Sequence, residues 1–163
     1  MATASPADHP QNHFSATKLP KVTVVVPTCS LRQPWQGLLR QMFEGQDYKG
    51  QKEMIMYDSP CGKRGIVDNF GLGKPNVIQQ NTMSRIFTYL WEDKPVKTGD
   101  KRNRLQRLAT GDILVHFDDD DYYGPSYIST MVHNLMTIPN VTMTKVRARN
   151  LVYVFAWVRV PAL

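Results

Sequence analysis

The chain has 163 residues, of which 42% are hydrophobic and 21% charged, as expected for one globular domain. Its formal net charge of +6 and pI near 9.4 suit nucleic acid, an anionic membrane surface or a nucleotide diphosphate, so charge alone selects no partner. The apolar residues 151–163 are too few to span a bilayer and are interrupted by Arg159 and Pro161, so we expect no transmembrane segment.

Residues 1–20 have almost no apolar periodicity and lack the features of a signal peptide. We expect residues 1–20 to be a disordered lead-in and residues 21–163 to form the domain. Cys29 and Cys61 are too few for a disulfide framework. We therefore expect a reduced, cytoplasmic compartment, with a peripheral location at a membrane as the alternative.

The first part of the domain predicts a strand, a helix and a second strand. Residues 21–27 form a β-branched run closed by Pro27, and residues 52–58 form an apolar run ending in Asp58. Between them, residues 33–46 predict a helix with Pro34 near its start. The apolar residues at helical spacing in this segment are Leu38, Leu39, Met42 and Phe43.

The second part repeats this order after a loop over residues 59–75. Residues 85–91 predict a third strand and residues 112–117 a fourth, with a basic helix over residues 99–109 between them. We expect Leu105 and Leu108 to face inward and Gly111 to suit the C-terminal cap of the helix. The more polar positions of the basic helix are Lys101, Arg102, Arg104 and Arg107. Residues 126–136 predict another helix, and residues 141–160 are largely extended.

This order predicts an α/β fold with a mainly parallel sheet and helices on both faces. In such sheets the ligand crevice lies beyond the carboxyl ends of the strands. Three predicted strands end there in polar or acidic residues, namely Thr28, Asp58 and Asp118. We therefore expect one site built from all three strand ends.

Four consecutive aspartates, Asp118 to Asp121, directly follow the apolar run that ends at Phe117. Adjacent carboxylates repel one another, and burial of an unpaired charge is costly, so the cluster needs a cation. Carboxylate oxygen is the ligand that Mg2+ and Mn2+ prefer. The alternative is a solvated acidic turn. Tyr122 and Tyr123 follow directly and are expected to form a wall of the site.

Four segments of the chain resemble family 2 glycosyltransferases, in the order found in that family. They are residues 22–28, ending in Pro27-Thr28; residues 54–59, with Asp58; residues 99–103, with Arg102-Asn103; and residues 111–125, with the aspartates. The resemblance covers roughly residues 22–150 and implies a GT-A-like (Rossmann-like) fold that binds a nucleotide-diphosphate sugar of the UDP or GDP type.

The resemblance also implies roles for individual residues. Asp118 and Asp120 span an Asp-x-Asp motif that would hold Mn2+ or Mg2+. Asp58 would accept a hydrogen bond from a base N–H, and Arg102 would donate to a base carbonyl or a phosphate. The donor-nucleotide residues that the resemblance implies are Pro27, Thr28, Asp58, Arg102, Asp118 and Asp119.

The chain departs from this family downstream of the metal motif. Inverting members use a carboxylate there as the general base, but no Asp or Glu follows Asp121. His133 is the one conventional base left, and its helix position suggests packing. The acceptor-binding half of the family is also missing. A truncated gene product, a fragment and a subunit completed by a partner chain are open interpretations of a domain that is incomplete at its C-terminus.

The predicted function is a metal-dependent glycosyltransferase acting on an unknown acceptor. The alternative is a degenerate GT-A domain that binds a nucleotide or a partner protein without transfer. A nucleic-acid binder ranks last, because the aspartates beside the basic helix would repel phosphate. A nucleotidyltransferase also uses paired aspartates at a sheet edge and stays open. The sequence does not define the sugar, the acceptor, the stereochemical outcome or the oligomeric state.

Overall fold

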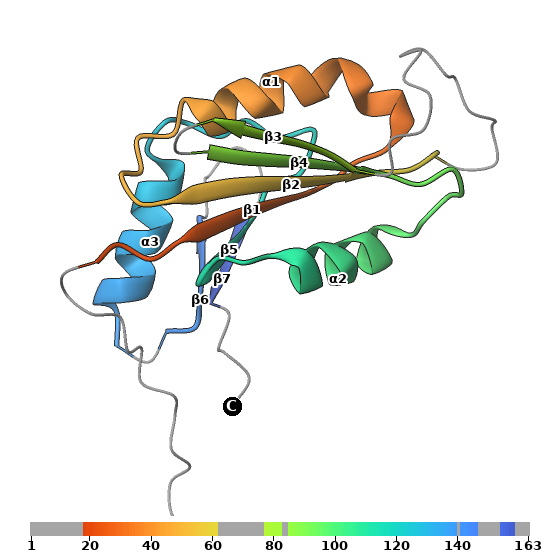
Figure 1. Cartoon of the computed structure of the whole chain (residues 1–163). Helices are drawn as coiled ribbons and strands as arrows, with labels where there is room; N and C mark the ends of the chain where they lie inside the picture. Colours follow the sequence, from red (N-terminus) through yellow and green to blue (C-terminus); the bar gives the residue numbers. More distant parts are fainter. Residues whose placement is uncertain (1–17, 62–76, 83–84, 140, 147–153, 159–163) are drawn as a thin grey trace, which may run out of the picture.

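The computed structural model describes residues 18–61, 77–82, 85–139, 141–146 and 154–158. Within these residues the chain forms one sheet of seven strands in the order β3-β4-β2-β1-β5-β7-β6. Helices α1 and α2 lie on opposite sides of this sheet (Figure 1). Residues 1–17 of the predicted lead-in lie outside the described residues.

Most elements lie close to the positions that the sequence predicts, whereas η1 and β3 are not predicted by the sequence. In chain order they are β1 (Val22–Pro27), the short 3-10 helix η1 (Ser30–Arg32), α1 (Gln33–Glu44), β2 (Lys52–Asp58), β3 (Val77–Thr82), β4 (Arg85–Trp91), α2 (Thr98–Leu108), β5 (Ile113–His116), α3 (Tyr127–Thr137), β6 (Met143–Val146) and β7 (Val154–Val158).

The centre of the sheet consists of the parallel strands β4, β2, β1 and β5. Val22 pairs with both Lys52 and Ile113, so β1, β2 and β5 start at one level and deliver their carboxyl ends to one edge. Strand β3 pairs antiparallel with β4, while β7 and β6 extend the other side in antiparallel order. The predicted α/β fold with a mainly parallel sheet is confirmed.

The two faces of the sheet are covered by different helices. On one face, α1 and α3 bury Leu39, Phe43 and Met131 against the β1 valines at positions 22, 24 and 26. On the other face, α2 buries Leu105 against Val25 and its neighbours. Strands that are buried on both faces explain why β1 reads as a continuous β-branched run without alternation.

Several local predictions are wrong. Leu108, predicted to face inward, is 49% exposed and does not face the core. Lys101, predicted on the polar side of its helix, is only 4% exposed. Ala109, rather than Gly111, caps α2, with its backbone N–H donating to Leu105 O. Gly111 instead lies against β1, where an added Cβ would come within 2.7 Å of the backbone nitrogen of Thr23.

A buried polar network fastens the edge of the sheet opposite to the carboxyl ends of the parallel strands. Glu53, at the start of β2, accepts hydrogen bonds from the Thr23 hydroxyl at 2.5 Å and from the Thr110 backbone N–H at 2.9 Å. Lys21 lies 2.9 Å from its other oxygen. Burial raises the pKa of Glu53, but these hydrogen bonds outweigh it and hold the pKa below its ordinary value of 4.5. The ionised carboxylate therefore joins β1, β2 and the α2–β5 connection.

We predict that Glu53→Gln lowers the free energy of unfolding at pH 7 by about 1–3 kcal/mol, because it removes a charge-assisted acceptor from a buried network. A depressed pKa stabilises the fold above the ordinary pKa and loses this effect as the pH falls through the folded-state value. Urea denaturation at pH 7 and at about pH 3 measures the difference. The gap between wild type and variant should shrink at the lower pH, and a gap independent of pH would contradict this account.

Candidate functional site

Thr28 connects the ends of three strands at the carboxyl edge of the sheet. Its backbone N–H donates to Tyr57 O at 2.9 Å, which places the end of β1 beside the end of β2. Its hydroxyl donates to Asp119 Oδ2 at 2.8 Å, which joins β1 to the residues that follow β5. The structure thus brings Thr28 into direct side-chain contact with the acidic turn after β5. Asp58, the third expected residue, directly follows Tyr57, whose carbonyl accepts the hydrogen bond from Thr28.

The aspartates that follow β5 form a tight turn held by an aromatic side chain. The backbone N–H of Asp121 donates to Asp118 O at 3.4 Å, and that of Asp118 donates to the Tyr123 hydroxyl at 2.5 Å. The Tyr123 ring is buried and stacks on Phe117, with the ring centroids 3.6 Å apart. Tyr123 is therefore a support behind the turn, whereas Tyr122 is 79% exposed.

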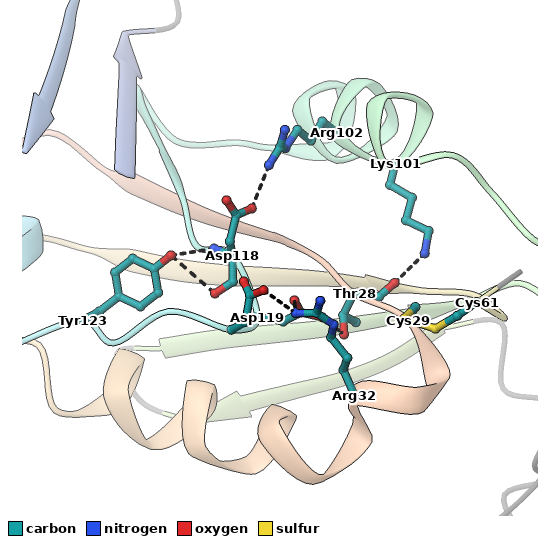
Figure 2. A network of polar contacts seen from close by, with 10 residues as sticks. Thr28, Cys29, Arg32, Cys61, Lys101, Arg102, Asp118, Asp119 and Tyr123 are labelled. Atoms are coloured by element: carbon teal, nitrogen blue, oxygen red, sulfur yellow. Dashed lines mark hydrogen bonds and ion pairs between the residues drawn. A yellow bond between two sulfur atoms is a disulfide. The ribbon is translucent and has the colours of Figure 1, made fainter. Parts of the chain in front are cut away.

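Two arginines from different elements neutralise the turn (Figure 2). Arg102, in the first half of α2, donates from Nη2 to Asp118 Oδ1 at 2.7 Å. Arg32, the last residue of η1, places Nη1 2.8 Å from Asp119 Oδ1 and 2.7 Å from Asp120 Oδ2. Three of the four carboxylates thus have a guanidinium partner, and these positive charges offset the repulsion between carboxylates that the sequence predicts.

The carboxylates of the turn differ in exposure, and those of Asp120 and Asp121 have pKa values shifted in opposite directions. The Asp119 side chain is only 10% exposed, whereas those of Asp118 and Asp120 are 38% and 61% exposed. The hydrogen bond from Arg32 lowers the pKa of Asp120. Burial, together with the neighbouring aspartates, raises the pKa of Asp121. Asp118 and Asp120 are therefore the members best placed to offer an oxygen to an incoming ligand.

Asp58 is fully buried at the end of β2 and has an unfilled acceptor. Its Oδ2 accepts hydrogen bonds from Gln36 Nε2 at 3.0 Å and from the Tyr89 hydroxyl at 2.5 Å. Its Oδ1 is buried without a partner among the described residues, as is the hydroxyl oxygen of Ser30. Burial raises the pKa of Asp58, although the hydrogen bonds that the carboxylate accepts, including one from the Ser59 backbone, oppose this. A buried acceptor without a donor is uncommon, and it fits a ligand that supplies an N–H or O–H.

Lys101 adds a buried positive charge next to Thr28. Its ammonium group donates to Thr28 O, and burial lowers its pKa although Asp58 and Asp119 oppose this. Neighbouring cations of α2 are also engaged: Arg102 with Asp118, and Arg104 with Glu92 at 2.5 Å. These cations face partners within the chain, which weakens the nucleic-acid interpretation of the basic helix.

His133 and His116 differ in their exposure to solvent. His133 is exposed on α3, and among the described contacts none joins its side chain to the acidic turn. His116 is partly buried in β5, where burial, helped by Arg102, lowers its pKa to about 4. His116 is therefore neutral at physiological pH. Among the described residues no hydrogen bond joins either histidine to Asp118 or Asp119, although His116 lies close enough to Arg102 and Asp118 for their charges to act on it.

Sequence reasoning missed Arg32, Gln36 and Tyr89. Arg32 and Gln36 are four residues apart, so they lie on one side of the η1–α1 segment, and each contacts an aspartate of the site. That spacing directly after a strand end is a signal the sequence does contain. Tyr89 comes from the strand beside β2, and its contact with Asp58 follows only from the sheet order.

The expectation of reduced cysteines is wrong. Cys29 and Cys61 form a disulfide, with their Cα atoms 5.4 Å apart. The bond joins the segment after β1 to the segment after β2 at the edge that carries the site (Figure 2). Disulfides are typical of oxidising compartments, so the premise of the cytoplasmic prediction is lost, and the location itself stays a prediction.

The donor set of the turn suits a divalent cation only in part. In the part of the chain that the structure describes, no three acidic, histidine or cysteine side chains are placed to hold a metal ion together. Mg2+ bound at a diphosphate needs only one or two protein carboxylates, because phosphates and waters complete its shell. Asp118 and Asp120 offer exposed carboxylate oxygens of this kind, so the residues fit a cation shared with a ligand.

No protein-family profile matches the chain, and no curated protein sequence matches it. Among solved structures, the glycosyltransferase TarS of S. aureus is similar, with 18% identity and a TM-score of 0.48. The similarity covers 71% of this chain and 19% of the TarS chain, so this chain spans about a fifth of its length. A match at this level identifies neither a family nor a function.

Among the described residues, no helix is long and apolar enough to cross a membrane.

We predict that Cys29→Ser combined with Cys61→Ser lowers the free energy of unfolding by about 3–4 kcal/mol, because the bond closes a loop with a sequence separation of 32. Urea denaturation of the variant, and of wild type with and without reductant, measures this effect. Reduced wild type should match the double variant. Identical midpoints for oxidised and reduced wild type would contradict the prediction.

Proposed function

We propose that the carboxyl edge of the sheet binds a nucleoside diphosphate together with a divalent cation, and that the chain is the donor-binding part of a metal-dependent glycosyltransferase. The observation that carries the proposal is the joining of Thr28, Asp58 and the acidic turn at one edge, where the buried Asp58 Oδ1 has no hydrogen-bond donor among the residues that the structure describes. The four segments that resemble family 2 glycosyltransferases supply the same residues.

In this proposal Asp58 reads the base. Its Oδ2 is occupied by Gln36 and Tyr89, which fix the carboxylate and leave Oδ1 as the acceptor for a ring N–H. Uracil and guanine both carry such a group, and cytosine and adenine lack a ring N–H where these bases have it. Discrimination would be strong, because a buried acceptor left without its donor is costly.

The positive groups around Thr28 suit the diphosphate. The Lys101 ammonium group donates to the Thr28 carbonyl, and the partly exposed Arg102 guanidinium donates to Asp118. Arg102 Nε is buried and has no partner among the described residues, so this side chain retains donor capacity for a phosphate oxygen. Asp118 and Asp120 would hold Mn2+ or Mg2+, which would supply positive charge that stabilises the leaving diphosphate.

A second candidate is a GT-A-like domain that binds nucleotide or a partner protein without transfer. The observation in its favour is that no Asp or Glu follows Asp121 in the sequence, and that among the described residues no contact joins His133 to the acidic turn. Under this candidate the donor side is retained and the acceptor hydroxyl has no base. The two candidates share the nucleotide site and differ in chemistry alone.

We predict that Asp120→Ala abolishes the Mn2+-dependent part of nucleotide binding, because Asp120 carries the most exposed carboxylate that an arginine holds in the turn. Calorimetric titration with UDP and with GDP, each with and without Mn2+, measures this. Asp121→Ala is the matched control, since its carboxylate has a raised pKa, and its effect should be smaller. Undiminished Mn2+-dependent affinity in Asp120→Ala would show that the aspartates are only an acidic turn.

We also predict that the 163-residue chain binds nucleoside diphosphates but transfers sugar to an added acceptor weakly or not at all. A general base typically contributes about 100- to 10,000-fold to such a reaction, and no carboxylate follows Asp121 to supply one. Product analysis with UDP- and GDP-sugars, with and without acceptor sugars, separates slow donor hydrolysis from transfer. Robust transfer by the isolated chain would overturn the second candidate.

A further inference from the structure

Arg32 occupies the acidic turn in an unusual way. A single guanidinium nitrogen, Nη1, lies 2.8 Å from Asp119 Oδ1 and 2.7 Å from Asp120 Oδ2, so it bridges two neighbouring carboxylates. One of these carboxylates is largely buried and also accepts a hydrogen bond from Thr28, whereas the other is exposed. Arg32 therefore pairs with the largely buried Asp119 and with the exposed Asp120 at the same time.

The backbone of Arg32 is fixed close to the site. Its N–H donates to Cys29 O at 2.8 Å, and Ser30 N–H donates to Ser59 O at 3.2 Å. The disulfide between Cys29 and Cys61 holds the same segment against the end of β2. The guanidinium can therefore exchange partners only within the reach of its own side chain, which keeps it beside the strand ends.

A carboxylate oxygen that binds a divalent cation cannot also keep a short hydrogen bond to an arginine at full strength, and two cations at that distance repel each other. We infer that Arg32 is an internal counter-ion that competes with the divalent cation for Asp120 and turns to the diphosphate when the cation binds. This inference rests on the proposed function, which assigns Asp120 to the cation.

The exchange links cation binding to nucleotide binding. With no nucleotide, the cation must displace Arg32 from Asp120 and leave it without an anion to replace that carboxylate. With a diphosphate present, Arg32 gains phosphate oxygens, and its planar donor geometry suits them. Arg32 would thus weaken the binding of the cation alone and strengthen the binding of the cation–nucleotide complex, a coupling that is reciprocal between the two ligands.

The test compares wild type with Arg32→Gln in two binding measurements. Electron paramagnetic resonance of free Mn2+ gives the affinity for Mn2+ alone, and calorimetry gives the affinity for preformed Mn2+–UDP and Mn2+–GDP. We expect the variant to bind Mn2+ alone about tenfold more tightly, the factor that corresponds to one charge-assisted pair of ordinary strength. We expect it to bind the Mn2+–nucleotide complex about tenfold more weakly. Opposite signs distinguish this role from general damage to the site, which would weaken both.

Arg40→Gln is the matched control, because it removes the same charge from α1, where Arg40 pairs with Glu44 at 3.0 Å. It should bind both ligands within about twofold of wild type. Arg32→Lys keeps the charge but not the planar donors, so it should restore the weak binding of Mn2+ alone and only part of the affinity for Mn2+–nucleotide. Far-UV circular dichroism checks that all variants are folded.

Each outcome has a separate meaning. Unchanged or weaker Mn2+ binding in Arg32→Gln would overturn the competition, while wild-type binding of Mn2+–nucleotide would leave the proposed function intact. Unchanged Mn2+–nucleotide affinity in Arg32→Gln would overturn the contact with the diphosphate. If wild type bound neither Mn2+ nor Mn2+–nucleotide, the proposed function itself would fail.

Discussion

Four adjacent carboxylates at the end of a buried strand are stable only with cations close by, and this constraint organises the carboxyl edge of the sheet. At an effective dielectric constant of about 20, two unit charges 4 Å apart interact by roughly 4 kcal/mol, so an unbalanced cluster would be costly. The chain supplies Arg102 from α2 and Arg32 from η1 as counter-charges. Each arginine comes from a segment that begins near the same edge, and neither is adjacent to the aspartates in sequence.

The parallel sheet makes this arrangement available. Because β1, β2 and β5 start in common register, their carboxyl ends lie together, and the side chains that follow them share one space. The opposite edge is closed by the Glu53 network, which has its hydrogen bonds satisfied within the chain. Within the part of the chain that the structure describes, the carboxyl edge retains hydrogen-bonding atoms without partners on Asp58 and Arg102. The hydrogen-bonding groups of one edge are thus paired within the chain, whereas the other edge carries unpaired ones, and this difference favours a ligand site at the carboxyl edge.

The sequence predicts the parallel core well, because β-branched runs such as residues 22–27 are buried on both faces and have little freedom to form anything else. It predicts the position of Thr28 beside the acidic turn for the same reason. Side-chain partners were harder to predict. Lys101 reads as a solvated helix residue, and its burial depends on where α2 docks on the sheet. The disulfide was missed because the cysteines were judged by their number alone, although Cys29 and Cys61 each closely follow a strand end that the sequence places at one edge.

The most direct test of the nucleotide site is the location of the bound ligand. Amide chemical-shift mapping of the 15N-labelled chain with GDP or UDP and Mg2+ reports the contacted backbone residue by residue, without metal paramagnetism. The account predicts that the largest shifts occur at Thr28, at Asp58 and Ser59, and in the turn from Asp118 to Asp121. Shifts concentrated around Glu53 and Thr110 at the opposite edge, or no saturable shifts at all, would contradict it.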